Sequence, residues 1–315
     1  MHQLRKIGIL GSNGFVGRHV IAQLESKGEN ISILPRISDA MLSQATHSMT
    51  EMAKVARSDF FSLLAGCTHV VNCAGKAHRR NSAGTSQSRL VNITLPSLLL
   101  TASAQRKVNC FVHVSSVAAI QSFSVNDEQI NEDALPQPDT VYGCEKREGD
   151  ASLENIALQR QVRLIILMPP MIYGRDAGGI FRYFLQAAQI GMPLPLSGLN
   201  NKRSAIHVDN LTDAIACAIR SDTLSGKFVV TGGPAVTQKE LYDSLTFASK
   251  GSSRSFSLPA SFVHAVARIF LRGRANSLIG NAVFDESKFR EMTGWVPPLS
   301  VAEGGVKCFQ DATIR

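Results

Sequence analysis

Two side chains spaced four residues apart, Tyr142 and Lys146, form the pair best suited to proton chemistry. On a helix, residues at this spacing project from one face into the same space. A phenol with its usual pKa of about 10 is a poor base at neutral pH. A neighbouring ammonium lowers that pKa because it stabilises the phenolate. We therefore expect Lys146 to bring the Tyr142 phenol into the working range of an acid/base catalyst.

A serine at the end of an apolar stretch offers a third group for the same site. Residues 110 to 116 read CFVHVSS, which predicts a buried strand ending in two hydroxyls. Ligands of doubly wound sheets bind at the carboxyl ends of the strands, so these hydroxyls are expected to face the site. Ser116 would hydrogen-bond the same substrate oxygen as Tyr142, and Ser115 is the competing candidate.

A glycine-rich turn near the N-terminus points to a bound dinucleotide. Residues 6 to 17 read KIGILGSNGFVG, an apolar strand, a tight turn and the start of an amphipathic helix. Gly11 would allow a positive φ, Gly14 a close approach to a pyrophosphate, and Gly17 close packing of helix on strand. The helix N-terminus would then face an anion. Three glycines alone are a weak signal, and the flanking strand and helix strengthen it.

The combination of these features predicts a nicotinamide cofactor. Tyr142, Lys146 and Ser116 would handle the proton of an alcohol while the nicotinamide handles the hydride, and its positive charge would also favour the phenolate. The second strand ends at Pro35, where an NAD-binding chain would carry an acid for the ribose 2′-hydroxyl, and Arg36 follows. This favours NADP, whereas Asp39 leaves NAD open and Arg36 as a solvated loop cation is the alternative.

Strand and helix patterns alternate through the first half of the chain, which predicts an α/β fold, a Rossmann-type doubly wound parallel sheet. A long helix is expected over 90–104 despite Pro96. A second helix, capped by Thr140 or Asp139, is expected to run to about Leu158. The strands are expected at 6–10, 30–34, 69–75, 110–116 and 162–168.

Beyond residue 170 the texture changes, with clustered glycine and proline and an expectation of shorter elements. We expect a dinucleotide-binding domain over 1–170 and a smaller, mainly substrate-binding C-terminal domain over 171–315. Within the latter, residues 203–231 are expected to return to the first domain, through a helix at 209–219 and a strand at 227–230. Residues 120–139 are expected to form a loop over the crevice.

Composition narrows the class of protein. The chain has 315 residues, 44% of them hydrophobic, yet no run of 18 apolar residues and no apolar core of a signal peptide, so we expect a soluble cytoplasmic protein with no membrane partner. The six cysteines lack CxxC spacing and the eight histidines lack metal-ligand spacing, which predicts reduced, buried thiols and no metal. The net charge of +8 is scattered, which favours an anionic small molecule over nucleic acid.

On these motifs the chain resembles the extended short-chain dehydrogenases/reductases, in particular the NAD(P)-dependent nucleotide-sugar epimerases, dehydratases and 4-keto reductases. The resemblance spans nearly the full length, through GSNGFVG, Asp59, the NCAG turn, VNITLPSLLL, HVSS, YGCEK, PPMIYG, RSAIHVDNLTDAI and GWVPPLS. It implies that Tyr142 is the catalytic acid/base, Lys146 its ribose-binding partner and Ser116 the third member.

The resemblance also implies a set of binding residues. Asp59 would contact the adenine, Tyr173 would line the nicotinamide pocket, and Arg203 with 207–209 would grip the nucleotide diphosphate. Together with the motifs above, the expected cofactor-binding residues are Gly11, Asn13, Gly14, Phe15, Val16, Gly17, Arg36, Asp59, Phe60, Cys73, Ala74, Gly75, Asn92, Tyr142, Lys146, Pro169 and Tyr173. The expected substrate-binding residues are His78, Ser116, Arg203 and His207. By analogy with this fold, the helices over 90–104 and 142–158 would pair in a homodimer.

The choice of reaction depends on the residues around Ser116. A dehydratase needs an acid and a base after this hydroxyl, but Val117 and Ala118 follow it, so dehydration is set aside. What remains is 4-epimerisation of a nucleotide sugar, expected to be a UDP-sugar, or reduction of a 4-keto sugar. Arg36 slightly favours the reduction.

Departures from the family pattern leave other functions open. Ile120-Gln121 replaces the usual Tyr-Gly, and no asparagine follows Tyr173-Gly174, which weakens the nucleotide-sugar assignment more than the redox one. The alternatives are an oxidoreductase acting on an uncharged carbonyl such as a steroid or flavonoid, and a non-catalytic protein that senses cofactor.

Overall fold

The structure is a computed structural model, and it describes residues 5–36, 61–77, 86–124, 128–259 and 280–310. Four residues singled out in the sequence, Asp39, Asp59, Phe60 and His78, lie outside the described residues.

The framework is a six-stranded parallel sheet in the order β2-β1-β3-β4-β5-β9. The chain crosses from β2, on one side of β1, to β3 on the other side. In open parallel sheets, ligands bind above such a reversal, at the carboxyl ends of the strands. The strands are β1 (Lys6–Leu10), β2 (Asn30–Ile33), β3 (His69–Asn72), β4 (Cys110–Val114), β5 (Arg163–Met168) and β9 (Gly226–Val229).

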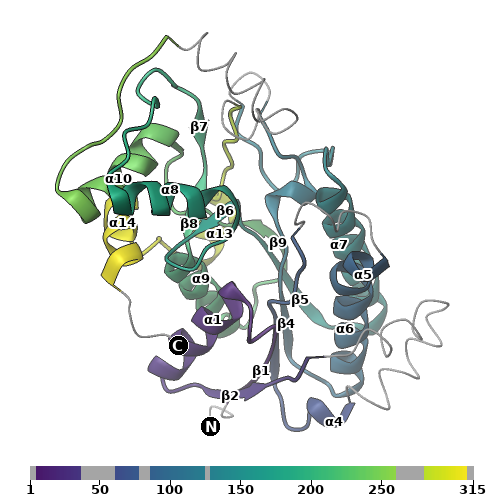
Figure 1. The fold of residues 1–315 in the computed structure, drawn as a ribbon. Helices are drawn as coiled ribbons and strands as arrows, with labels where there is room; N and C mark the ends of the chain where they lie inside the picture. Colours follow the sequence, from purple (N-terminus) through teal and green to yellow (C-terminus); the bar gives the residue numbers. More distant parts are fainter. Residues whose placement is uncertain (1–4, 37–60, 78–85, 125–127, 260–279, 311–315) are drawn as a thin grey trace.

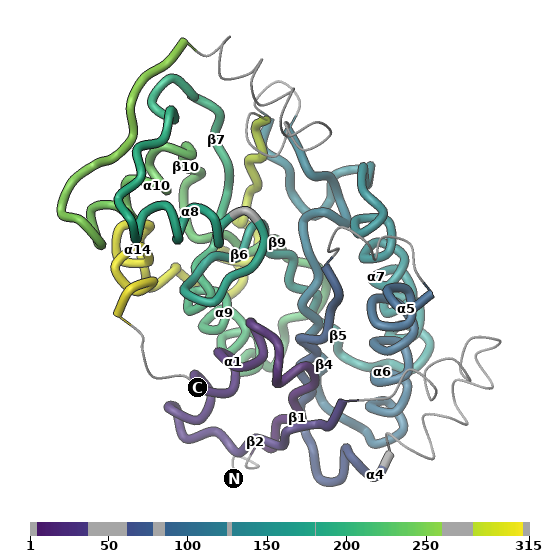
Figure 2. The backbone as a smooth tube through the Cα atoms, viewed as in Figure 1, coloured from purple at the N-terminus to yellow at the C-terminus, as the bar shows by residue number. Residues whose placement is uncertain are grey.

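Helices cover both faces of this sheet (Figures 1 and 2). On one face, α1 (Phe15–Ser26) packs against α9 (Val208–Arg220), and on the other α6 (Leu95–Gln105) packs against α7 (Val141–Arg160). The alternation along β4 follows from this arrangement, since Val112 joins the core under α1 and α9 whereas Phe111 joins the core under α6 and α7. The predicted doubly wound α/β fold is therefore confirmed.

The predicted helix over 90–104 is present but is composite. A short helix α5 (Ser86–Arg89) leads into a π-helical turn η2 (Leu90–Thr94) and then into α6. Pro96, the second residue of α6, has no N–H to donate to the Asn92 carbonyl one turn earlier, so the turn widens there. Asn92 lies within this turn and is buried.

The second half of the chain adds helices that the sequence pattern did not predict. A third apolar cluster lies between α8 (Gly179–Ile190), α10 (Gln238–Lys250) and α14 (Val301–Gln310). Two small sheets accompany it, formed by β6 (Met171–Tyr173) with β8 (Ala205–His207) and by β7 (Lys202–Arg203) with β10 (Val236–Thr237). The expectation of shorter elements was therefore wrong for α8 and α10.

Parts of the second half return to the large sheet. Strand β9 pairs with β5, and α9 packs on α1, as expected for the 203–231 segment. Helix α13 (Ser287–Thr293) also packs on β9, through Phe289 and Phe228. Within the loop at 120–139, Ile130 forms an isolated parallel β-bridge with Phe284. This bridge joins the loop to a segment far along the chain. The proposed division into two domains remains a prediction.

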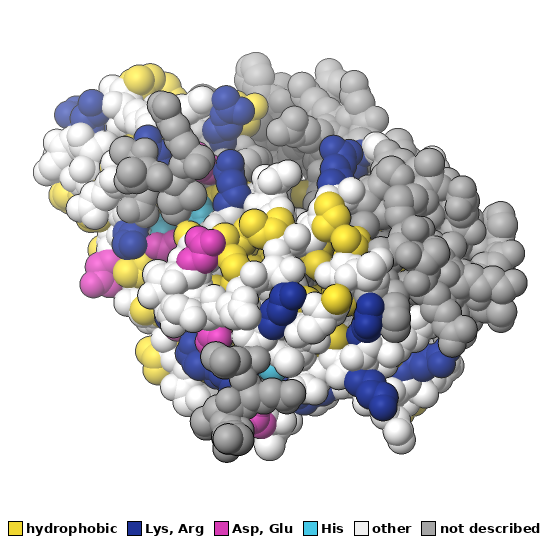
Figure 3. Space-filling view, turned by 90° about the horizontal axis from the view of Figure 1, so that it is seen from below, with side chains coloured by type: hydrophobic (Ala, Val, Ile, Leu, Met, Phe, Trp, Pro, Cys, Tyr) yellow, Lys and Arg dark blue, Asp and Glu magenta, His cyan; other side chains and the backbone are white. Residues whose placement is uncertain are grey.

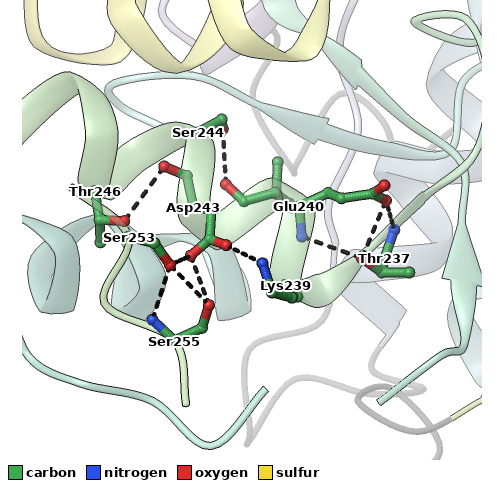
Figure 4. A network of polar contacts seen from close by, with 9 residues as sticks. Thr237, Lys239, Glu240, Asp243, Ser244, Thr246, Ser253 and Ser255 are labelled. Carbon is green, nitrogen blue, oxygen red and sulfur yellow. Dashed lines mark hydrogen bonds and ion pairs between the residues drawn. The ribbon is translucent and has the colours of Figure 1, made fainter. Parts of the chain in front are cut away.

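A polar network fixes the chain after α10 (Figure 4). Thr237 and Glu240 form a capping box that starts the helix. Farther along, Asp243 accepts hydrogen bonds of 2.6 Å from the hydroxyls of both Ser253 and Ser255 and pairs with Lys239. The carboxylate thus holds the following segment against the helix.

On the face shown in Figure 3, the described Lys and Arg side chains lie in several separate places among uncharged and apolar ones. Helices long and apolar enough to cross a membrane are absent from the described part of the chain.

All six cysteines are free thiols, and Cys144 is exposed, so the expectation that the thiols are buried was wrong there. Among the described residues, no group of acidic, histidine and cysteine side chains could hold a metal ion.

Candidate active site

The glycine turn has the conformation that its sequence predicts. Gly11 follows β1 with a φ of +87°, and Gly14 is the N-cap of α1. A Cβ on Gly11 would lie 2.6 Å from the Ala74 nitrogen, and one on Gly17 would lie 2.1 Å from the Gly11 oxygen. Both positions therefore require glycine, because a side chain would separate helix, turn and the end of β3.

A cavity of about 410 Å³ opens above this turn, at the topological switch between β1 and β3. It contains seven of the predicted cofactor-binding residues: Gly11, Asn13, Gly14, Arg36, Cys73, Ala74 and Gly75. Phe15, Val16 and Gly17, also predicted, continue into α1 and are not on its lining. The remaining lining residues are Leu10, Ser12, Leu34, Lys76, Gln87, Val91 and Leu95.

The charged groups on this cavity are both cations. Arg36 and Lys76 line it, and no carboxylate does among the lining residues. Sequence reasoning missed Lys76, although its place directly after the NCAG turn could have indicated it. The Asn92 side chain forms two hydrogen bonds with the Lys76 backbone, accepting from its N–H at 2.9 Å and donating to its carbonyl at 3.1 Å. The Lys76 ammonium donates to Gln87.

Asn92 thus connects the cavity wall to α7. Its amide also donates to the buried Glu145 carboxylate at 2.8 Å, and Ser88 donates to the other Glu145 oxygen at 2.6 Å. Asn92 itself is buried and does not line the cavity. The arrangement matches a buried amide that ties the backbone together, and direct contact of Asn92 with cofactor remains a prediction.

Helix α7 presents Tyr142 to Ser116. Thr140 caps the helix by accepting from the Gly143 N–H at 3.0 Å, as predicted, and Ser116 caps the short helix η3 (Val117–Ala119) by accepting from the Ala118 N–H at 3.2 Å. The two capped turns touch, because a Cβ on Gly143 would lie 2.3 Å from the Ala118 oxygen. Tyr142 and Ser116 are joined by a side-chain hydrogen bond.

The structure distinguishes the two serines. The Ser115 hydroxyl points away from Tyr142 and donates to Asp150 at 2.6 Å in the buried layer under α7. Ser116, one residue later, faces the phenol. Of the two candidates, Ser116 is the one placed to share a substrate oxygen with Tyr142.

The expected effect of Lys146 on the phenol is not found. Burial raises the pKa of Tyr142 to about 12, and the hydrogen bond from Ser116 opposes this only in part. The Lys146 ammonium is directed elsewhere, donating to the Val114 carbonyl at 3.0 Å with His113 Nε2 at 3.2 Å. A phenol with this pKa is protonated at neutral pH.

Several predicted residues lie outside the cavity lining, and all of these but the half-buried Arg203 are buried. Tyr173 is 2% exposed and packs on Phe181 and His207 in the third apolar cluster. His207 is equally buried, and its Nδ1 accepts from the Asp209 N–H at the start of α9. Arg203 stacks on the Phe123 ring and donates to the Gly280 carbonyl at 2.9 Å. Pro169 is buried after β5 and accepts from the Val117 N–H.

The residues present fit a dinucleotide. A Cβ at Gly11 would collide with the neighbouring turn, the N-terminus of α1 and two cations face the cavity, and Leu34, Val91 and Leu95 offer apolar surface. Strand β4 lies beside β3 in the sheet and is followed by Ser116. Ser116, Tyr142 and Lys146 are not on the cavity lining, and their contact with a cofactor remains a prediction.

Comparison with known proteins decides the family. The model of the NAD dependent epimerase/dehydratase family matches residues 7–231, from the first strand to just after β9. The chain belongs to this family. It is an NAD(P)-dependent enzyme of the extended short-chain dehydrogenase/reductase type, and the dinucleotide fold described above is the fold of that family.

Two named relatives match this chain over most of its length. A UDP-glucose 4-epimerase of Vibrio cholerae is 25% identical over 307 residues, covering 95% of this chain and 93% of the relative. A decarboxylating sterol-4-alpha-carboxylate 3-dehydrogenase of Dictyostelium discoideum is 24% identical over 263 residues, covering 79% and 78%. Among solved structures, UDP-N-acetylglucosamine 4-epimerase from Bacillus cereus shares the fold with a TM-score of 0.77, 20% identity, and coverage of 96% and 98%.

Proposed function

We propose that this member of the epimerase/dehydratase family interconverts UDP-sugars that differ in configuration at C4. The observation that carries the proposal is the Ser116–Tyr142 hydrogen bond at the carboxyl end of β4, followed by a wholly apolar turn of Val117, Ala118 and Ala119. This arrangement can move one proton on and off a sugar hydroxyl, and the turn offers no second acid or base for eliminating water. The near full-length similarity to a UDP-glucose 4-epimerase supports the same assignment.

The chain's own groups would act on the C4 oxygen. Ser116 Oγ would hydrogen-bond that oxygen and hold it beside Tyr142 Oη, which would take the hydroxyl proton during oxidation and return it during reduction. A bound nicotinamide supplies the hydride acceptor and donor. Burial raises the pKa of Tyr142 to about 12, so Tyr142 would take the proton only as a phenolate, which the Ser116 hydrogen bond and the positive charge of a bound oxidised nicotinamide would both favour.

A second candidate, NADPH-linked reduction of a 4-keto sugar, is supported by a different observation. The cavity carries Arg36 at the end of β2 and Lys76 after β3, with no carboxylate among its lining residues. A carboxylate at this place would bind a ribose 2′-hydroxyl, whereas a guanidinium favours a 2′-phosphate. Reductive use of NADPH would need the same Tyr142, Lys146 and Ser116.

The two functions are separated by supplying UDP-glucose or UDP-N-acetylglucosamine to the purified protein without added cofactor. We expect the 4-epimer to form, with nicotinamide released from the protein on denaturation. Absence of epimer, together with NADPH consumption when a UDP-4-keto sugar is supplied, would establish the reductase. Inactivity towards every nucleotide sugar with turnover of a sterol substrate would contradict both.

Cofactor choice is tested by Arg36→Ala. The exposed guanidinium on the cavity is expected to contact a 2′-phosphate, so the variant should bind NADP about 10- to 100-fold more weakly while its affinity for NAD changes little. Titration calorimetry with both dinucleotides measures this. Arg89→Ala, which removes an exposed arginine outside the cavity, is the control. Equal losses for the two cofactors would remove the 2′-phosphate argument.

A further inference from the structure

Five polar side chains are buried beneath the phenol, between β3, β4 and α7, and the proposed proton transfer does not use four of them. Asn72, His113, Lys146 and Asp150 are at most 1% exposed, and Ser115 is 4% exposed. Burying charged groups is costly unless they are paired, so a cluster of this kind requires a reason. The Lys146 ammonium lies at its centre.

The hydrogen bonds of Asn72 fix the protonation of His113. The Ala74 N–H can only donate, so the Asn72 atom that faces it at 3.0 Å is the carbonyl oxygen. The Asn72 amide nitrogen then faces His113 Nδ1 at 3.1 Å and donates to it. Because Nδ1 accepts, the neutral ring carries its proton on Nε2. Burial and the nearby Lys146 charge lower the pKa of His113, which keeps the ring neutral.

His113 Nε2 lies between an amine and a carboxylate. It is 3.2 Å from Lys146 Nζ and 3.7 Å from Asp150 Oδ1. A protonated Nε2 and an ammonium both only donate, so His113 and Lys146 share no hydrogen bond in this state, and the nearby Asp150 carboxylate carries the negative charge on this side of the ring. Among the described residues, Asp150 Oδ1 has no hydrogen-bond partner, whereas Oδ2 accepts from Ser115 at 2.6 Å.

We propose that Asp150 is a positioning residue for Lys146, the buried counter-charge that holds the ammonium in place, with the neutral His113 ring filling the space between the two. The assignment rests on the proposed function and on the role that the family resemblance implies for Lys146, binding of the cofactor ribose. Ala74 lines the cofactor cavity and donates to Asn72, which donates to His113, so the cluster around the amine is joined to the cavity wall.

The charges around the amine give the proposal a definite sign. Burial lowers the pKa of Lys146 and Asp150 raises it, so loss of the carboxylate charge must lower it further. Burial raises the pKa of Asp150 to about 6, against which Lys146 and the Ser115 bond act; Glu154 and Lys227 are its more distant charged neighbours. His113 is the other titratable group beside the amine, and Tyr142 lies one helical turn before Lys146.

The first test measures dinucleotide affinity by calorimetry from neutral to alkaline pH, using the full chain and Asp150→Asn. This variant keeps the shape of the side chain and can keep the Ser115 bond. We expect the pH at which affinity is half lost to fall by about one unit or more. His113→Gln should weaken binding several-fold without moving that midpoint, because the Asp150 charge remains.

Glu148→Gln is the matched control, since it removes a carboxylate from the exposed side of the same helix, where Glu148 pairs with Arg89. Its midpoint should equal that of the wild type. A midpoint in Asp150→Asn that equals these two would overturn the counter-charge. Failure of the wild type to bind either dinucleotide would instead overturn the proposed function.

A second test needs no cofactor. The raised folded-state pKa of Asp150, about 6 against its ordinary 3.8, means that the folded state binds the extra proton, so this group's contribution to stability falls as pH rises through that window. The Tm of Asp150→Asn relative to wild type should therefore increase from the lower to the higher of these pH values. A constant difference would contradict the raised pKa of Asp150.

Discussion

Tyr142→Phe is expected to lower turnover by roughly 10²- to 10⁴-fold or more, the range typical for loss of a general acid/base. The substitution removes only the hydroxyl that hydrogen-bonds Ser116 at the end of β4. The cofactor cavity, the glycine turn and the Lys146 cluster keep all of their groups, so dinucleotide affinity should change by less than about threefold. A large change in kcat with little change in cofactor Kd is the signature of a group that acts on the reacting proton.

The measurement is single-turnover change in nicotinamide absorbance with a UDP-sugar, paired with calorimetric titration of the cofactor. Tyr183→Phe, at a 70% exposed position on α8, is the control and should behave as wild type. Unimpaired turnover in Tyr142→Phe would exclude the phenol as acid/base.

Gly143→Ala is expected to lower turnover about 10²-fold while the protein stays folded. The new Cβ would lie 2.3 Å from the Ala118 oxygen, so the first turn of α7 must move away from η3. Tyr142 and Ser116 belong to those two turns and would separate. Misplacing reacting groups by about 1 Å costs about this much in rate. Overpacking of this kind also costs about 1–3 kcal/mol of stability.

Steady-state kinetics and thermal unfolding separate the two effects. Gly178→Ala is a suitable control, because its φ of −87° suits any residue and no atom lies within 4 Å of the added Cβ. It should leave both rate and Tm unchanged. Wild-type turnover in Gly143→Ala would show that the contact between α7 and η3 does not set the catalytic geometry.

The framework was predictable because local and long-range signals agree. Apolar strands buried on both faces, the positive φ at Gly11 and the cap at Thr140 each follow from residue type alone. Spacing placed Tyr142 on a helix, and the hydroxyl that ends the neighbouring strand could be named to within one residue.

What could not be predicted depends on side-chain direction and burial. A motif identifies Tyr173 and His207 but not that both point into a core. Spacing puts Lys146 near Tyr142, yet the amine turns towards the Val114 carbonyl, which accepts from it, and lies beside His113. Lys76 was missed because its backbone is held at the cavity by the side chain of Asn92. Asn92 lies sixteen residues later in the chain, within a π-helical turn.

Helix α7 rests on its neighbours at two places where it has no side chain. Besides Gly143, it meets the sheet-covering layer at Gly149, whose Cβ would lie 2.4 Å from the Asn92 oxygen. Backbone touches backbone at both points, so the helix can neither slide nor rotate without a collision. A substitution in the loops or in the third apolar cluster can therefore reshape the rest of the molecule without displacing the helix that carries Tyr142 and Lys146, which makes the scaffold a promising host for altered binding.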